Sequence, residues 1–122
     1  SSIVVTTPQK VAISDCKKGI EMINKLNLPI SGLIENMSWF QPDETDKKYY
    51  LFGRDGGKEL SQEYSLDLLA QLPLVELTDD ANIQNNPTLK KEFVNISDKL
   101  TESIKNLKEK KSAGIPQINI IQ

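Results

Sequence analysis

An asparagine at the end of an apolar run is the first candidate for chemistry in this chain. Residues 30–34 are typical of a buried strand in a parallel sheet, and the polar residues Glu35 and Asn36 follow them. Ligands of open α/β sheets bind at the carboxyl ends of the strands. Asn36 is therefore a candidate binding residue, and a plain turn residue is the alternative interpretation.

Cysteine and histidine usage limits the chemistry further. The chain has one cysteine, Cys16, and no histidine. These counts exclude a Ser-His-Asp triad, a histidine general base and the usual zinc ligand sets. No disulfide can form within the chain, which fits a reducing compartment, so we expect a cytoplasmic protein. Cys16 belongs to a helical apolar stripe and is predicted to be a small buried side chain rather than a reactive thiol.

A glycine-rich segment at 53–58 invites comparison with a phosphate-binding loop, because a predicted helix follows it at 57–64. The pattern GxxxxGK[ST] would need a glycine where Phe52 stands and a serine or threonine where Glu59 stands. The match fails at both positions. We therefore predict a flexible turn that begins a helix, without a role in binding nucleotide phosphates.

The composition is that of one soluble globular domain. Of the 122 residues, 38% are hydrophobic and 26% are charged, and the net charge is −2. No basic excess indicates nucleic acid or an anionic membrane surface, and no apolar run is long enough to span a bilayer. We therefore expect neither nucleic acid nor a membrane as a partner.

The first part of the chain has the pattern strand, helix, strand. The β-branched residues at 3–5 predict a fully buried strand, and because the chain begins almost inside it we expect a fragment. Thr7 and Pro8 predict the N-cap and first residue of a helix that runs to about residue 27. Residues 30–35 predict a second strand, parallel to the first. The apolar stripe of the helix is Ala12, Cys16, Ile20, Ile23 and Leu26.

The second part predicts one more strand and a long helix. Residues 49–52 are predicted to pair with 39–40 as a hairpin, and 66–72 to form a third buried strand. Thr78 or Asp79 would cap a short helix that ends before Pro87. Apolar residues three or four apart predict a helix over 88–110 with one face on the sheet. They are Leu89, Phe93, Ile96, Leu100, Ile104 and Leu107.

Four segments, taken together, resemble one family. They are Val4-Val5-Thr6-Thr7-Pro8-Gln9, Gly32 to Phe40 (GLIENMSWF), Phe52-Gly53 with Gly56-Gly57, and Gln71-Leu72-Pro73-Leu74. In order and spacing they are similar to the C-terminal half of the Mrp/ApbC group, which contains ATP-binding iron–sulfur cluster carriers with a MinD/ParA-like P-loop fold. Asp15, Lys18 and Gly19 match its D-x-x-K-G pattern, and the resemblance covers about residues 3–108.

This resemblance implies an α/β fold: part of a doubly wound, mostly parallel sheet flanked by helices, which is a partial P-loop NTPase fold. Residues 1–111 would be the C-terminal part of the NTPase domain, and 112–122 a tail that is either disordered or an edge strand. Members of the family bind ATP, form homodimers and carry a 4Fe–4S cluster for delivery to apo iron–sulfur proteins. By this resemblance Asn36 would contact the adenine, and Pro73 and Leu74 would line the base pocket.

Two motifs of the family are not matched in these residues. The Walker A loop and the acidic residues that handle magnesium would lie upstream of Ser1, so we expect this chain alone neither to hydrolyse ATP nor to bind it tightly. The C-P-x-C cluster motif would place its cysteines where Pro42 and Thr45 stand. Neither of these residues can bind iron as a thiolate.

Two other interpretations stay open beside that of an inactive fragment of an ATP-binding cluster carrier. One is a non-enzymatic interaction module that docks through a sheet edge left open by missing strands. The other is a fragment of a MinD/ParA-like partitioning ATPase, which would be indicated by an amphipathic membrane helix at the C-terminus. Pro116 lies in the tail that follows the last predicted helix and counts against that second alternative.

Overall fold

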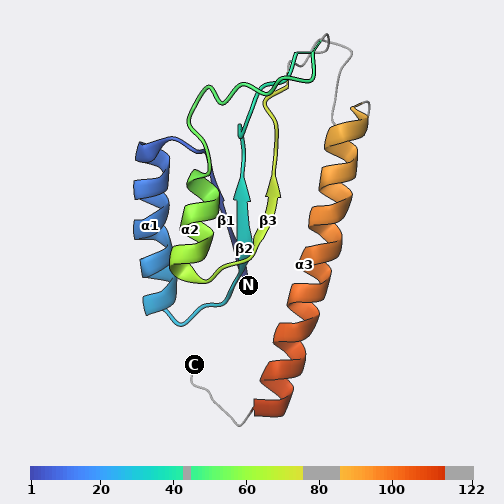
Figure 1. Ribbon diagram of the computed structural model, residues 1–122. Helices are drawn as coiled ribbons and strands as arrows, with labels where there is room; N and C mark the ends of the chain where they lie inside the picture. The colour runs from blue at the N-terminus through green and yellow to red at the C-terminus, as the bar shows by residue number, and fades with distance from the viewer. Residues whose placement is uncertain (43–44, 76–85, 115–122) are drawn as a thin grey trace.

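The computed structural model describes residues 1–42, 45–75 and 86–114, with side chains up to residue 109 in the last range (Figure 1). The elements are β1 (Ser2–Thr6), α1 (Lys10–Lys25), β2 (Ile30–Glu35), α2 (Gly56–Tyr64), β3 (Leu68–Gln71) and α3 (Pro87–Gly114). The strands form one parallel sheet in the order β1-β2-β3. The predicted α/β fold with parallel strands is confirmed, and β2 has the predicted bounds.

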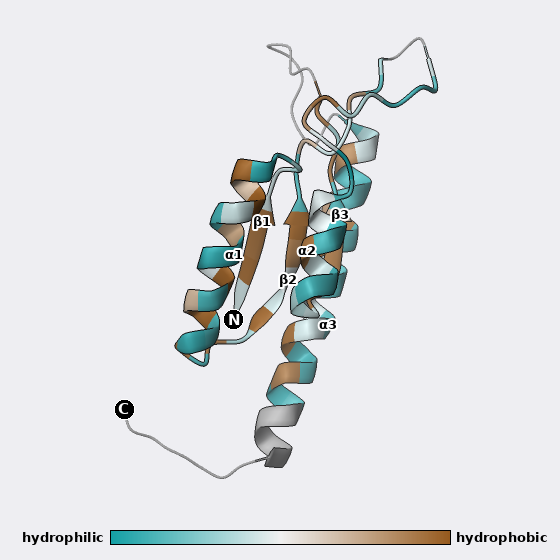
Figure 2. Ribbon diagram, turned by 60° about the vertical axis from the view of Figure 1, so that its left-hand side comes forward, coloured by the Kyte–Doolittle hydropathy of each residue, from teal (hydrophilic) through white to brown (hydrophobic). Residues whose placement is uncertain are grey.

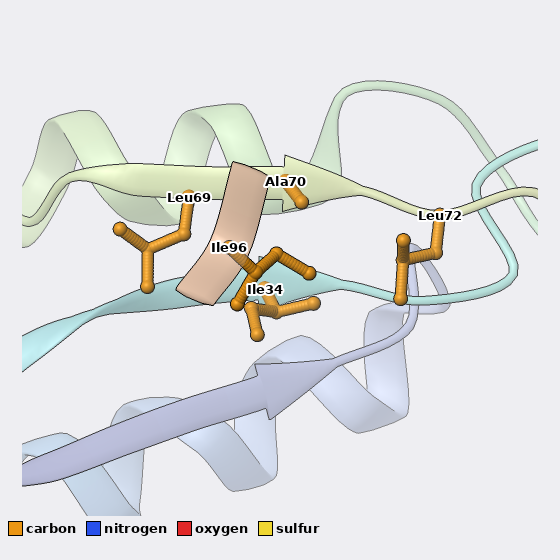
Figure 3. Packing of buried hydrophobic residues seen from close by; sticks show 5 residues of the cluster. All are labelled: Ile34, Leu69, Ala70, Leu72 and Ile96. Carbon is orange, nitrogen blue, oxygen red and sulfur yellow. The ribbon is translucent and has the colours of Figure 1, made fainter. Parts of the chain in front are cut away.

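Two clusters of apolar side chains join the helices to the two faces of the sheet. On one face Val4 and Leu33 pack with Ile20 of α1 and Leu60 of α2. On the other face Ile96 of α3 packs with a cluster from β2, β3 and the residue after β3 (Figure 3). That cluster is Ile34, Leu69, Ala70 and Leu72. The sheet is therefore the middle layer, with α1 and α2 on one side and α3 on the other (Figure 1).

The hydropathy of the elements follows these layers. Hydrophobic residues concentrate on the strands, and the helices carry hydrophilic residues along their outer surfaces (Figure 2). Lys17 of α1 pairs with Glu63 of α2 at 3.0 Å on this outer surface. Burial raises the pKa of the Tyr64 hydroxyl, and its 2.9 Å hydrogen bond to Glu21 raises that pKa further. Within the described residues, no helix is both long enough and apolar enough to cross a membrane.

The first strand is less buried than its sequence predicts. Val4 is 8% exposed, but Ile3 is 39% and Val5 57% exposed, so the prediction of a fully buried strand is wrong. Ile3 and Val5 lie beside Gly32 and Ile34 of β2, on the face that α3 covers. Because α3 packs on β3 and β2, these two side chains have no helix over them in the described part of the chain.

The start of α1 also differs from the prediction. The helix begins at Lys10, with Gln9 as an extended N-cap that makes no side-chain capping bond, instead of starting at Thr7 and Pro8. Pro8 lies outside the helix, and a Cβ on Gly53 or Gly56 would lie 3.1 or 3.0 Å from its carbonyl oxygen. The predicted stripe is confirmed at Ile20, which is fully buried, whereas its last member Leu26 is 62% exposed. The other three, Ala12, Cys16 and Ile23, are half-buried.

The remaining elements lie close to their predicted places. Phe40 and Tyr49 form an antiparallel bridge at the predicted hairpin, and β3 is shorter than predicted. The α3 helix starts at Pro87, where the side chain of Asn86 accepts the Leu89 N–H at 3.1 Å, and it extends to Gly114. Its stripe is confirmed at the buried Leu89 and Ile96, but Phe93 and Ile104 are each 41% exposed. The predicted short helix at 77–81 and residues 115–122 lie outside the described residues.

Candidate functional site

The three predicted site residues lie in one pocket at the carboxyl edge of the sheet. Asn36, Pro73 and Leu74 line a cavity of about 220 Å³. Backbone hydrogen bonds bring them together, because the segments after β2 and β3 continue side by side beyond the strands. Ser38 N–H donates to Leu72 O at 2.9 Å, and Leu74 N–H donates to Trp39 O at 2.7 Å.

Asn36 is anchored through its backbone and has its side chain at the pocket. Its N–H donates to Thr6 O at 2.7 Å, which continues the ladder between β1 and β2. Its side-chain oxygen accepts the Met37 N–H at 2.9 Å, and Met37 has the left-handed φ of 56°. This local bond is the turn chemistry given as the alternative for Asn36. It leaves the side-chain NH₂ group available as a donor.

Helix α3 supplies a wall of the pocket that sequence reasoning missed. Leu89 and Phe93 line the cavity opposite the loop residues Pro73 and Leu74. The sequence did place Phe93 on the apolar stripe of this helix. Periodicity cannot show, however, that the Phe93 side chain stays 41% exposed. The lining is completed by Met37, Leu72 and Val75. An apolar slot with one amide at its side suits a flat aromatic ring with a polar edge.

Glu35 is a second residue that sequence reasoning did not single out. It is 1% exposed, and its carboxylate accepts the Gly57 N–H at 2.6 Å and a side-chain N–H of Gln71 at 3.3 Å. A carboxylate at a helix N-terminus is stabilised by the helix dipole. A Cβ on Gly57 would lie 2.7 Å from the same carboxylate, so this position needs glycine. Glu35 thereby ties β2, β3 and the start of α2 together directly beside Asn36.

The glycine-rich loop forms a turn of restricted geometry. Gly53 has a φ of 114°, and Asp55 takes the left-handed conformation as N-cap of α2. The Gly57 amide, one of those that a phosphate would use at this helix start, already binds Glu35. The loop positions α2 and does not carry the Asn36 pocket, because none of its residues lines that cavity.

Pro42 and Thr45, which stand where the family motif would have its cysteines, are joined by a backbone hydrogen bond. Thr45 N–H donates to Pro42 O at 3.2 Å, and the Thr45 hydroxyl accepts the Lys47 N–H at 3.1 Å. Cys16 is elsewhere, on α1, with its sulfur 3.5 Å from Val5 O, and is half-buried rather than buried. In the described parts of the chain, no group of three or more His, Cys, Asp or Glu residues could hold a metal ion.

The chain is similar to a family of P-loop NTPases and to individual iron–sulfur cluster proteins. The family model for NUBPL iron-transfer P-loop NTPases (ParA) matches residues 1–109. The iron–sulfur cluster transfer protein NUBPL of Mus musculus is 44% identical over 73 residues, which are 60% of this chain and 23% of that protein. An iron–sulfur cluster carrier protein of Methanocaldococcus jannaschii is 35% identical over 114 residues, covering 88% of this chain and 39% of that protein.

A solved structure shows the same fold. The nucleotide-binding protein of Archaeoglobus fulgidus in complex with ADP superposes with a TM-score of 0.52 at 24% identity, over 74% of this chain and 32% of that one. The chain thus spans between about a quarter and two fifths of the length of these relatives.

Proposed function

Because the chain belongs to the family of NUBPL iron-transfer P-loop NTPases, we propose that it is the adenine-binding part of an ATP-binding iron–sulfur cluster carrier. The observation that supports this function is the shared pocket of Asn36, Pro73 and Leu74 at the carboxyl edge of a parallel sheet. Asn36 would offer its amide to the polar edge of the base, and Leu74 and Phe93 would contact the ring. Only the adenine base of a bound ATP would occupy this pocket, and its triphosphate would be bound by residues outside the pocket.

By itself the chain is proposed to be inert. In P-loop enzymes, the backbone amides and lysine of the Walker A loop, together with the magnesium ligands, supply most of the affinity and the catalysis. None of these motifs occurs in the 122 residues. The adenine pocket alone should therefore bind ATP only weakly, with a dissociation constant of roughly millimolar order. Homodimer formation and delivery of clusters to apo iron–sulfur proteins would belong to the protein completed by a Walker A half.

Nuclear magnetic resonance provides the test for the adenine site. Titrating ATP into the chain should shift the amide signals of Asn36, Ser38 and Leu74 saturably, and GTP should shift them less because its base has a different polar edge. Asn36→Ala should remove the saturable shift, and the matched variant Asn24→Ala, on the exposed surface of α1, should keep it. Unchanged shifts in Asn36→Ala would contradict the site, and turnover of Mg-ATP at ordinary P-loop rates would contradict the inertness.

The iron–sulfur cluster is the cargo of the family, and the residues of this chain do not fit it at the expected place. Pro42 and Thr45 offer no thiolate, and the one thiol of the chain, Cys16, is half-buried on α1. Anaerobic incubation with iron and sulfide should therefore give no more cluster absorption in the native chain than in Cys16→Ser. A stable 4Fe–4S spectrum that depends on residues 39–49 would contradict this expectation.

An interaction module is the second candidate, and the free edge of β1 favours it. Ser2 N–H and Thr6 O both bond toward β2, so the peptide groups of Ile3 and Val5 point away from the sheet. Of these groups, Val5 O accepts the weak Cys16 thiol donor at 3.5 Å, and an edge of this kind beside exposed apolar side chains is a template for another strand. Light scattering during size-exclusion chromatography tests this candidate: association that grows with concentration supports it, and a monomer at high concentration contradicts it.

A further inference from the structure

The outer edge of β1 is bordered on one face of the sheet by α1. Cys16 Sγ of α1 lies 3.5 Å from Val5 O. That carbonyl group points away from β2, because Ser2 N–H and Thr6 O, on either side of it along the strand, bond toward β2. The helix therefore reaches past the edge of β1, whereas α2 packs on β2 and β3. We call the space beside β1 and beneath α1 the edge slot.

A row of half-buried residues lines the α1 side of the edge slot. Its members are three or four positions apart and so share one side of the helix. They are Ala12, Cys16, Gly19 and Ile23. Lys17 points to the opposite side, where it pairs with Glu63 of α2 at 3.0 Å. The row therefore lies on the side of α1 away from α2, and a Cβ on Gly19 would have no atom within 4 Å.

β1 offers an incoming strand both hydrogen-bonding groups and apolar contacts. The peptide groups of Ile3 and Val5 point into the edge slot. Their side chains are 39% and 57% exposed on the face beside α3. The Cys16 thiol at Val5 O is a weak donor, and a peptide N–H can take its place. β1 contains no charged residue, so this edge has no partner for a charged side chain.

We propose that the edge slot binds one extended, uncharged segment of a partner protein as an added β-strand. Exposed sheet edges take up peptides in this way, through main-chain hydrogen bonds and alternate side chains. Side chains of the segment that face α1 would be small, because Cys16 and Gly19 lie above them. Those on the other face would be apolar and β-branched, to pack beside Ile3 and Val5. The adenine site is independent of this proposal, because its pocket contains none of these residues.

A lone strand fits the edge slot better than the edge of a second copy of this chain. Neighbouring strands lie about 4.8 Å apart, and packed helices need about 8–10 Å between their axes. Pairing two β1 strands edge to edge would put both α1 helices over the same two strands, closer than that. Next to the slot, Met22 and Leu26 of α1 are 60% and 62% exposed, which gives the rest of a partner protein an apolar surface beside its strand.

Fluorescence anisotropy tests the proposal. The probe is a short fluorescein-labelled peptide in which isoleucine and valine alternate with alanine and serine, with a lysine at each end for solubility. Titrated with the whole chain, it should bind saturably and with little dependence on salt, because strand pairing needs no ion pair. Gly19→Leu should weaken binding about tenfold or more by filling the slot, although no atom of the fold lies within 4 Å of the new Cβ. The matched change Lys18→Leu, at the exposed neighbouring position, should leave binding unchanged.

N-methylated peptides test the strand pairing itself. Only alternate peptide groups of an added strand bond to its neighbour. Methylating one alternate set of amides should therefore weaken binding about tenfold or more, and methylating the other set should change it less than about twofold. Replacing the alanine by tryptophan should also weaken binding, because the larger side chain would meet α1.

Four results would each overturn the proposal. They are equal effects of the two methylated sets, unchanged binding in Gly19→Leu, an equal loss in Lys18→Leu, and no saturable binding of the probe. If the probe does not bind and Gly19→Leu abolishes self-association of the chain in light scattering, the edge slot belongs to a second copy instead.

Discussion

β1 and β3 are the two outer strands of the described sheet, and they are built differently. On β3, Leu69 is 3% exposed, and its carbonyl oxygen accepts a hydrogen bond from Lys99 of α3 at 3.0 Å. On β1, Val5 is 57% exposed, and the partner that the structure gives its carbonyl oxygen is the thiol of Cys16, a weak donor at 3.5 Å. On the face beside α3, a helix and a lysine cover β3, whereas β1 has no helix over it there in the described residues.

The difference shows what an apolar strand needs in order to be buried. β1 contains only Ser, Thr, Ile and Val, with no lysine, proline or other residue that usually protects a free edge. Such a composition is typical of an interior strand. β3 instead receives its protection from α3. On the face of β1 beside α3, a further strand or helix would therefore bury the exposed side chains of Ile3 and Val5.

The largest expected effect comes from truncating the same kind of side chain at the two strands. Leu69→Ala should lower the free energy of unfolding by about 2–5 kcal/mol, because it leaves a cavity in the cluster under α3. Ile3→Ala should cost less than about 1.5 kcal/mol, because that side chain is already 39% exposed. Urea denaturation measures both values, and equal losses would break the comparison.

A methyl group added at Gly32 of β2 tests how tightly the sheet is packed toward β3. Gly32 lies in register with Ile3, yet a Cβ there would lie 2.5–2.9 Å from three side-chain carbons of Leu69. Gly32→Ala should therefore cost about 1–3 kcal/mol through overpacking against β3. The control is Gly19→Ala on α1, which has no atom within 4 Å of the new Cβ and should stabilise the chain by about 0.5–1 kcal/mol. A harmless Gly32→Ala would show that the β3 side is loosely packed.

The protective bond on β3 should have a moderate effect. Lys99→Ala removes the donor to Leu69 O and should cost about 0.5–1.5 kcal/mol. Lys91→Ala, a lysine exposed on the same helix, should change the stability by less than about 0.5 kcal/mol. Thermal unfolding followed by circular dichroism compares the two variants. If both behave alike, Lys99 does not distinguish β3 from β1.

The smallest change in stability is expected on the open strand, where association is the better measure. Val5→Lys should alter the free energy of unfolding by less than about 0.5 kcal/mol, since the side chain is mostly exposed. It should nevertheless lower any concentration-dependent association, because a lysine protects a free strand edge. Val94→Lys, at a 52% exposed position on α3, should leave association unchanged. Light scattering of the three chains decides whether β1 is the contact surface.

The sequence by itself determined the features that depend on short windows of residues. The β-α-β order, the bounds of β2 and the buried core of the α3 stripe follow from periodicity and from β-branched residues. The family followed from four short segments in a fixed order. Asn36, Pro73 and Leu74 were named from these segments, and the structure places them in one pocket.

Only the tertiary structure decided which surface covers each element. Val4 and Val5 have the same local pattern, but one is buried by α1 and α2 and the other has no helix above it in the described residues. The sequence alone indicates only that Glu35 is a polar residue at the end of a strand. In the structure it is buried, and its carboxylate accepts a hydrogen bond from the Gly57 N–H at the start of α2. Pro8 lies outside α1, and its carbonyl oxygen lies close to two glycines more than 40 residues away along the chain. Propensity acts within a few neighbours, whereas burial and hydrogen-bond partners depend on segments that only folding brings together.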